Sequence, residues 1–295
     1  MNKVYTKDIL KRVFKDNEYK IVSRLYGGMM NISYLIEDEY QRKYIMYIPN
    51  GKANKLVNRV NEKANQQIAY NLGITSRNLY FDTLRGIKIN DYIEGTSLDK
   101  YEGEIDYQKV ADLLHILHSS KELCPNDYNP IQRYFNYEKK ALSYQPLSVR
   151  YYKSRDFFFS ELPYLEAHYE KIVSHNDFQK SNIILTNDGE YKVIDFEFAG
   201  NNDPIYDIAA FGNNNVDDGE ELLKHYFVNP GEDEYRRFYL WRIFISLQWF
   251  LVAISKHYQK EGKGTGFNFM SVAEYFLINA EEAKRRFERL FVNKK

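Results

Sequence analysis

The chain has 295 residues, enough for one large domain or for two lobes with a cleft. Basic and acidic residues balance at 41 each, so the net charge gives no case for binding nucleic acid or an acidic membrane surface. Cys124 is the only cysteine, which excludes an internal disulfide and a metal cluster of thiolates. A cytoplasmic location is the simplest fit, because the N-terminal segment has mixed charge and lacks the apolar core of a signal peptide.

The first third of the chain is predicted to form strands around one helix. The strand-like runs are residues 19–26, 32–37, 43–49, 78–82 and 86–93. Residues 54–72 have the composition of a helix, and Gly73 fits its C-terminal cap. The pattern breaks at residues 94–97, which places the lobe boundary after residue 94.

The remainder, residues 95–295, is predicted to be mainly helical. Apolar residues recur at helical spacing in residues 107–121, and further helices are expected at 150–171, 220–227, 235–258 and 271–290. The most apolar of these runs, residues 240–254, contains Arg242 and Gln248, which favours a buried helix over a membrane span. The fold class is therefore α+β, with a small five-stranded sheet lobe, a hinge and a larger helical lobe.

Residues 175–182 (HNDFQKSN) and the Asp195-Phe196-Glu197 triplet carry the strongest chemical signal. Residues 181–186 and 191–198 are strand-like and flank Asn187-Asp188-Gly189, so they read as a hairpin. This hairpin brings Asn182 and Asp195 to neighbouring positions at one end. Two oxygen ligands placed in this way suit Mg²⁺.

Asp177 lies five residues before Asn182 and is placed to take a proton from an attacking hydroxyl. A lone His-x-Asp is common, and a single Asp at a strand end is often a cap. Together, however, the residues match the H-x-D-x-x-x-x-N loop and the following metal-binding Asp of phosphoryl-transfer enzymes. The sequence therefore predicts phosphoryl transfer.

Two features of the first lobe fit the same chemistry. Gly27 and Gly28, in the loop that ends at Asn31, could cover phosphates with backbone N–H groups, although an ordinary hairpin turn is the alternative. Glu62 lies mid-helix, where a kinase needs a carboxylate to orient a phosphate-binding cation. A solvated helix glutamate is the alternative for Glu62.

For Asp207 and the histidines, a structural role has to be weighed against a functional one. Asp207 could be a helix N-cap or a buried support for the catalytic loop. His115 and His118 are three residues apart, but no carboxylate partner of a zinc site accompanies them, so His118 is predicted to be a packed helix residue. His175 is expected to brace the loop rather than act as the base.

With these residues identified, the chain resembles the choline/ethanolamine kinases, particularly the bacterial choline kinases, within the aminoglycoside-phosphotransferase-like group. The resemblance runs from about residue 25 to residue 207 and more loosely to the C-terminus. Its carrying segments are LYGGMMNISYLI, NKLVNRVNEKANQ, GIKINDYIEG, SHNDFQKSNIILT and VIDFEFAGNNDPIYDIAAF. It implies a protein-kinase-like two-lobe fold, with residues 1–94 binding the nucleotide and residues 95–295 carrying the catalytic loop and the acceptor site.

The resemblance also implies roles for individual residues in ATP- and Mg²⁺-dependent phosphorylation of a small hydroxyl substrate. Asp177 would be the catalytic base, Asn182 and Asp195 the Mg²⁺ ligands, and Glu197 would lie near the metal or the substrate. Residues 90–95 would form the adenine-binding hinge, which places Asn90, Asp91, Tyr92 and Ile93 at the nucleotide. Structural support is expected from His175, Asn202 and Asp207.

The expected acceptor is choline, a quaternary ammonium alcohol that such enzymes hold with aromatic faces and nearby carboxylates. The candidate aromatic residues are Tyr206, Trp241, Trp249 and Phe250, for which packing in helix cores is the alternative. Rival acceptors are ethanolamine, an aminoglycoside or a thiamine-like alcohol. Acidic residues at 217, 218, 220 and 221 would suit an aminoglycoside, unless they are a solvated helix start.

Three departures from the family pattern stand out. The position in the third strand that usually holds a phosphate-binding Lys or Arg is Tyr47, which brings no positive charge. Either Lys52, Lys55 or Arg59 substitutes, or nucleotide affinity is low, or the alignment slips. Asn214 replaces a frequent acidic residue, and Trp241 and Trp249 are eight residues apart instead of forming W-x-x-W. A non-catalytic pseudokinase is the rival from another class, although Asp177, Asn182 and Asp195 are all present.

Overall fold

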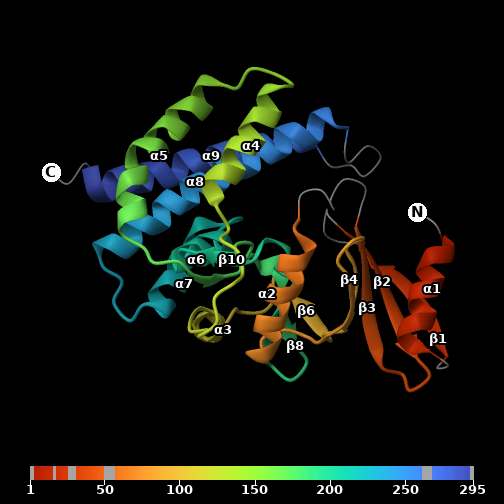
Figure 1. The fold of residues 1–295 in the computed structure, drawn as a ribbon. Helices are drawn as coiled ribbons and strands as arrows, with labels where there is room; N and C mark the ends of the chain where they lie inside the picture. The colour runs from red at the N-terminus through yellow and green to blue at the C-terminus, as the bar shows by residue number, and fades with distance from the viewer. Residues whose placement is uncertain (1–2, 16–17, 26–30, 50–56, 261–267, 293–295) are drawn as a thin grey trace. The chain divides into compact units, whose positions relative to one another are not determined.

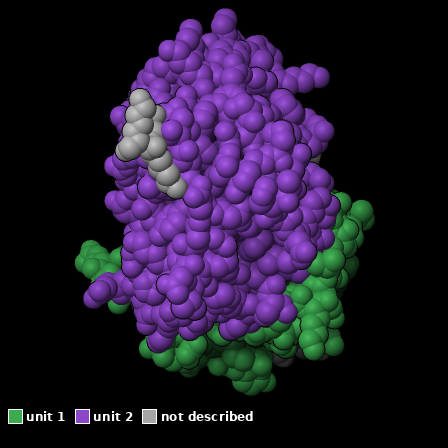
Figure 2. Space-filling model, turned by 90° about the vertical axis from the view of Figure 1, so that its left-hand side faces the viewer, with its two compact units in different colours: residues 1–103, 120–126, 181–199 green, residues 104–119, 127–180, 200–295 purple. Residues whose placement is uncertain are grey.

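The computed structural model describes residues 3–15, 18–25, 31–49, 57–260 and 268–292. The chain forms two compact units (Figure 2). The sheet unit comprises Met1–Gly103, Ser120–Asn126 and Ser181–Ala199, and the helical unit comprises Glu104–Ser119, Asp127–Lys180 and Gly200–Lys295. The division after residue 94 stays a prediction; the compact units differ from it in grouping residues 95–103, 120–126 and 181–199 with the sheet.

The sheet unit contains the predicted five-stranded sheet (Figure 1). Its strands are β1 (Tyr19–Leu25), β2 (Asn31–Asp38), β3 (Lys43–Pro49), β4 (Asn78–Asp82) and β5 (Ile87–Asp91). They are ordered β1-β2-β3-β5-β4, and every neighbouring pair is antiparallel. Each predicted run falls on one of these strands, and the run at 43–49 matches β3 at both ends.

An N-terminal helix, which was not predicted from the sequence, packs against one face of this sheet. Tyr44, Met46 and Ile48 alternate along β3 and are buried, as a half-buried strand requires. Helix α1 (Lys3–Phe14) packs Leu10 and Phe14 against them. The N-terminal segment, despite its mixed charge, therefore forms an amphipathic helix.

Helix α2 (Arg59–Asn71) begins and ends at recognisable caps. The Asn58 side chain accepts hydrogen bonds from the first N–H groups of the helix. Gly73 has φ +76° and donates to the Tyr70 carbonyl, while Ile74 donates to Ala69, the Schellman arrangement that a C-terminal glycine favours. The predicted cap at Gly73 is confirmed; residues 54–56 of the predicted helix lie outside the described residues.

The predicted hairpin forms part of a second sheet within the same unit. Strands β6 (Gly95–Ser97), β8 (Ile183–Thr186) and β9 (Tyr191–Val193) pair in the order β6-β8-β9. Gly189 has φ +84° in the turn, as a glycine permits. The expectation that the second strand runs to Phe198 is wrong, because the left-handed backbone of Asp195 (φ +69°) ends the extended run. The 3₁₀ turn Phe196–Phe198 follows.

The helical unit is built around one long helix (Figure 1). Its helices are α3 (Tyr107–His118), α4 (Pro130–Leu142), α5 (Val149–Ala167), α6 (Pro204–Phe211), α7 (Val216–Tyr226), α8 (Glu232–Tyr258) and α9 (Phe269–Phe287). Short strands β7 (Ile172–Ser174) and β10 (Gly200–Asn202) pair antiparallel. This unit also has a π-helical turn at Glu288–Val292, and a 3₁₀ turn at Lys180–Asn182 lies where the chain passes from the helical unit into the sheet unit. The five predicted helices are present with shifted ends, whereas α4 and α6 were not predicted.

Helix α8 is the core helix of this unit, and it packs against α4, α5, α6 and α9. By length and composition alone it could cross a membrane, but 83% of its most apolar window is buried inside the protein. Arg242, fully enclosed, donates to the Ala209 carbonyl and to the Ser246 hydroxyl. The predicted buried helix at residues 240–254 is confirmed.

Candidate active site

The predicted site residues fall in both units, and each group is described within its own unit. In the helical unit, hydrogen bonds of the Asn176 side chain stabilise the loop that follows β7 and carries Asp177. Its amide donates to the carbonyls of Ser174 (3.1 Å) and Gly200 (3.0 Å) and accepts from Asn202 (2.8 Å). Asn176 also has φ +63°, a conformation that Asn adopts more readily than most residues. Asn202, predicted as support, thus contacts the loop directly.

Asp207 holds the same loop from helix α6. Its carboxylate accepts the backbone N–H of His175 (2.7 Å) and of Asn176 (2.6 Å), and His118 Nε2 lies 3.1 Å from it. The N-cap of α6 is Asp203, so the N-cap alternative for Asp207 is wrong and the buried support is what the structure shows. His118 is buried, as predicted for a packed helix residue.

The half-buried Asp177 carboxylate is oriented by side chains that the sequence did not single out. Gln179 Nε2 donates to Asp177 Oδ1 at 2.5 Å, and Asn213 Nδ2 donates to Gln179 Oε1 at 3.1 Å. Gln179 lies two residues along the chain and could have been considered. Asn213 comes from beyond α6, and no local signal points to it.

In the sheet unit the hairpin places Asn182 and Asp195 at the same end, as predicted. Ile183 pairs with Val193, and the backbone N–H of Ile194 donates to the Asn182 carbonyl at 2.9 Å. Asp195 is the residue at which the chain leaves the hairpin, and 28% of its side chain is exposed. Its Oδ1 is buried and has no hydrogen-bond partner among the described residues.

Carboxylate oxygens of Glu62, Asp195 and Glu197 lie within 4.8 Å of one another. Burial first, and then the charge of Asp195, raises the pKa of Glu197 to about 8. Glu62 is already engaged, because it accepts from Lys88 Nζ and from Arg59 NH1, each at 2.5 Å. The amide oxygen of Asn182 and the carboxylates of Asp195 and Glu197 are the donor types that Mg²⁺ prefers, so the predicted ligand set fits the ion chemically.

Lys88 on β5 occupies the centre of this charged cluster. Its ammonium lies 2.5 Å from Glu62, 3.8 Å from Asp195 and 4.8 Å from the centroid of the Tyr47 ring. Burial lowers the pKa of Lys88, but the carboxylates of Glu62 and Asp195 outweigh it and hold the pKa above its ordinary value. Burial likewise raises the pKa of Glu62, yet Lys88 and Arg59 bring it below the ordinary value. The solvated alternative for Glu62 is wrong, because Glu62 is 1% exposed.

The remaining nucleotide-side predictions lie near the same strands. Gly27, Gly28, Lys52 and Lys55 lie outside the described residues, and Asn31 is the first residue of β2. Asn90 and Asp91 end β5, where they pair with Asn78 and Arg77 respectively, and Tyr92 donates its N–H to the Lys43 carbonyl. Ile93 follows. Arg59, offered as a substitute cation, lies near Glu197 at 3.5 Å as well as beside Glu62.

The four aromatic candidates divide into two groups in the helical unit. Tyr206 and Trp241 pack edge-to-face with ring centroids 5.0 Å apart, and Trp241 Nε1 donates to Asp203 at 2.7 Å. Burial, and then the Tyr128 hydroxyl, raises the pKa of Tyr206, and the charge of Asp177 adds to this effect. Tyr206 and Trp241 are each only 1% exposed, so both side chains pack in the core of the helical unit, the alternative given for them above.

Trp249 and Phe250 also pack against aromatic side chains of other helices. Trp249 stacks on Phe276 at 5.9 Å and Phe250 stacks on Tyr151 at 5.2 Å. These are contacts between helices in the core, the alternative given for them above. Their part in binding the acceptor stays a prediction.

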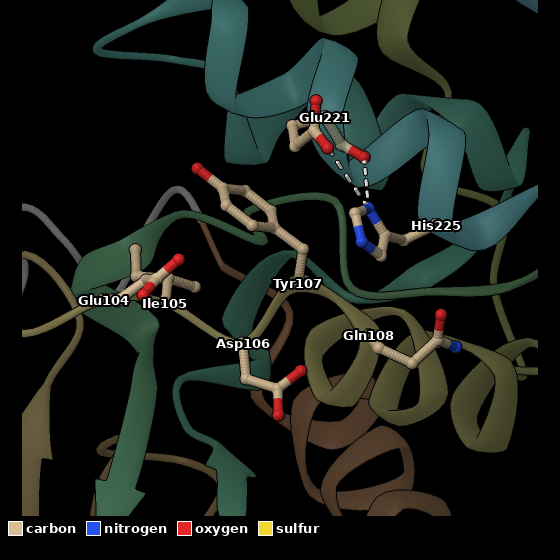
Figure 3. Close-up of a pocket in the computed structure, with 7 residues that line it drawn as sticks. All are labelled: Glu104, Ile105, Asp106, Tyr107, Gln108, Glu221 and His225. Atoms are coloured by element: carbon tan, nitrogen blue, oxygen red, sulfur yellow. Dashed lines mark hydrogen bonds and ion pairs between the residues drawn. The ribbon is translucent and has the colours of Figure 1, made fainter.

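A surface pocket of about 540 Å³ opens elsewhere in the helical unit (Figure 3). It contains none of the predicted site residues and is lined by Glu104, Ile105, Asp106, Tyr107, Gln108, Glu221 and His225. Glu221 belongs to the acidic run considered for an aminoglycoside acceptor. All four acidic residues of that run are paired, Glu221 with Lys224, Asp218 with Lys180, and both Asp217 and Glu220 with Arg286.

With this geometry established, comparison with known proteins is informative. The profile of the phosphotransferase enzyme family, abbreviated APH, matches residues 22–241, more than half of the chain. The chain belongs to this phosphotransferase family. Among its relatives, protein LicA of Haemophilus influenzae is 28% identical over 203 residues, which is 66% of this chain and 58% of LicA. The chain thus matches less than two thirds of that relative's length.

Solved structures of phosphotransferase relatives show the same fold. The choline kinase LicA of Streptococcus pneumoniae superposes with a TM-score of 0.75 at 24% identity, covering 98% of this chain and 99% of that one. A choline/ethanolamine kinase family protein of Mesorhizobium loti gives a TM-score of 0.76 at 19% identity, covering 96% and 97%. The predicted kinase-like fold, with a five-stranded sheet lobe and a helical lobe, is confirmed.

Proposed function

We propose that this phosphotransferase catalyses the transfer of the γ-phosphoryl group of ATP to the hydroxyl of a small cationic alcohol, choline, and so makes phosphocholine. The observation that carries the proposal is the buried Oδ1 of Asp195, which has no hydrogen-bond partner among the described residues and belongs to the end of the hairpin where Ile194 donates its N–H to the Asn182 carbonyl. The Lys88 ammonium lies 3.8 Å from this oxygen, which is too far for a hydrogen bond, so the oxygen keeps a coordination position for a metal ion. The H-x-D-x-x-x-x-N loop supplies the base that the same chemistry needs.

The chemistry divides among residues with distinct tasks. Asp177 accepts the proton of the acceptor hydroxyl as that oxygen attacks phosphorus, and Gln179 holds the Asp177 carboxylate in one orientation. Asn182, Asp195 and Glu197 hold Mg²⁺, which when bound neutralises charge on the phosphate oxygens. Asn90, Asp91, Tyr92 and Ile93 bind the adenine, and the loop containing Gly27 and Gly28 covers the phosphates. Residues 1–94 then form the nucleotide lobe of a cytoplasmic enzyme, and residues 95–295 form the acceptor lobe.

Choline is favoured as the acceptor by the similarity of the chain to LicA, which is a choline kinase in Streptococcus pneumoniae. Aromatic faces attract a quaternary ammonium group, and the Tyr206–Trp241 pair, each side chain of which is 1% exposed, is the candidate pair for this contact. An aminoglycoside is disfavoured because all four acidic side chains that would receive it are paired with Lys180, Lys224 or Arg286. A pseudokinase is disfavoured because Asp177, Asn182 and Asp195 are all present in the sequence.

The acceptor is tested by measuring ADP release from MgATP with choline, ethanolamine and kanamycin in parallel. We expect kcat/KM for choline to exceed that for ethanolamine by about tenfold or more, because ethanolamine lacks the methyl groups that contact aromatic faces. Kanamycin is expected to give only the background rate. Equal background rates with all three acceptors would favour a nucleotide-binding module without kinase activity.

A further inference from the structure

We propose that Lys88 on β5 is the residue that binds the nucleotide phosphates in this chain, in the role that a Lys or Arg on β3 fills in kinases. This inference rests on the proposed function, because it concerns the nucleotide half of the same site. The kinase arrangement pairs the phosphate-binding Lys with a carboxylate on the helix after β3. Here that helix is α2, its carboxylate is Glu62, and the ammonium bonded to it comes from Lys88.

The sheet register explains how a β5 residue reaches this place. Lys88 is the direct cross-strand partner of Tyr47, the β3 residue where the positive charge is missing. Directly opposite residues of an antiparallel pair project to the same face, with Cβ atoms about 5 Å apart. The end of a long side chain at position 88 can therefore reach nearly the same positions as the end of one at position 47. The positive charge is thus supplied from the neighbouring strand at the same site.

Tyr47 still contributes to the site without carrying a charge. Its ring lies 4.8 Å from the Lys88 ammonium, a distance at which an aromatic face attracts a cation. Burial raises the pKa of Tyr47 to about 12, so the phenol is neutral at physiological pH. Tyr47 thus supports the ammonium and does not compete with it for anions.

Lys88 is better placed for this role than Arg59. Arg59 projects from α2 itself, three residues before Glu62, and lies between Glu62 and Glu197. Lys88 lies between Glu62 and Asp195, the predicted metal ligand. It also precedes Asn90 and Asp91 on the strand that leads into the predicted hinge. One strand therefore joins a positive charge to the segment expected to hold the adenine.

The proposal is tested on three full-chain variants by two measurements, the equilibrium binding of MgATP without any acceptor and kcat/KM for ATP with choline as the acceptor. Lys88→Met is expected to weaken binding or lower kcat/KM for ATP by about 10- to 100-fold, because a charge-assisted contact to phosphate is lost. The exchange variant Tyr47→Lys/Lys88→Tyr returns the ammonium to β3 and is expected to recover at least about tenfold of that loss. Lys100→Met, at an exposed position of the same unit, is the matched control and is expected to behave as wild type.

A folded Lys88→Met protein with unchanged MgATP affinity and unchanged kcat/KM for ATP would overturn the proposal. So would a folded exchange variant that recovers nothing. Because a buried lysine can be needed for folding, wild-type protein is also treated with an adenosine analogue that carries a 5′-sulfonyl fluoride, and the modified lysine is identified by mass spectrometry. An ATP-protected label on Lys88 supports the proposal, and an ATP-protected label on another lysine contradicts it.

These readouts separate the two proposals. The choice of acceptor fails and the role of Lys88 stands if wild type binds MgATP but does not phosphorylate choline, and the Lys88→Met protein no longer binds MgATP. If wild type phosphorylates choline and Lys88→Met does so equally well, only the role of Lys88 fails. If wild type does not bind MgATP, both fail.

Discussion

Replacing Asp177 by alanine is expected to lower kcat for phosphorylation by about 10²- to 10⁴-fold while leaving the MgATP dissociation constant within about twofold of wild type. The loss follows because no other carboxylate is held at that point of the loop, where Gln179 orients Asp177. Nucleotide affinity is retained because the groups that hold ATP are proposed to lie in the sheet unit. Steady-state ADP release and equilibrium nucleotide binding measure the two quantities separately.

Asp99→Ala is the matched control for this variant, because it removes the same carboxylate from an exposed position. It is expected to leave both quantities unchanged. Wild-type turnover by the Asp177→Ala protein would contradict the assignment of Asp177 as the base. A large loss of MgATP affinity without a loss of kcat would equally contradict it.

Replacing Asp207 by asparagine is expected to lower the free energy of unfolding by about 3 kcal/mol and to reduce turnover. The Asp207 carboxylate is fully buried and accepts two backbone N–H groups, from His175 and Asn176, with His118 beside it. An amide presents its NH₂ to one of these donors, so a buried N–H loses its acceptor. Urea denaturation followed by circular dichroism gives the stability difference.

Asp156→Asn provides the control for Asp207→Asn. Its carboxylate belongs to the same unit but is 67% exposed and pairs only with Arg155 among the described contacts. Such surface pairs contribute about 0–1 kcal/mol, so the control is expected to unfold close to wild type. An Asp207→Asn protein as stable and as active as wild type would show that the support from α6 is dispensable.

The strands and long helices could be predicted because their patterns are local. Residues 43–49 alternate apolar and polar side chains, and β3 forms at those positions. Helix α1 was missed because Leu10 and Phe14 stand among many charges, and only the sheet supplies the surface that they cover. The strand predicted to reach Phe198 ends at Val193, because Asp195 adopts a left-handed backbone that no side-chain pattern announces.

The site was predictable to the extent that its residues share a short motif. Asp177, Asn182 and Asp195 follow from spacing, and the hairpin that joins the last two is a local structure. Lys88 was not found, because nothing near it in the sequence marks it. Its importance comes from pairing with Tyr47 across the sheet and with Glu62 on α2, and both relations depend on the fold. The sequence shows that Tyr47 brings no positive charge to β3, and the sheet register indicates Lys88 as the residue that we propose supplies that charge.

The most direct test of the account is ³¹P NMR of the purified protein incubated with MgATP and choline. The account predicts the growth of a phosphomonoester resonance matching phosphocholine in step with ADP, with no such resonance in a parallel sample of Asp177→Ala. Loss of ATP without a phosphomonoester product, or equal product formation by wild type and Asp177→Ala, would contradict it.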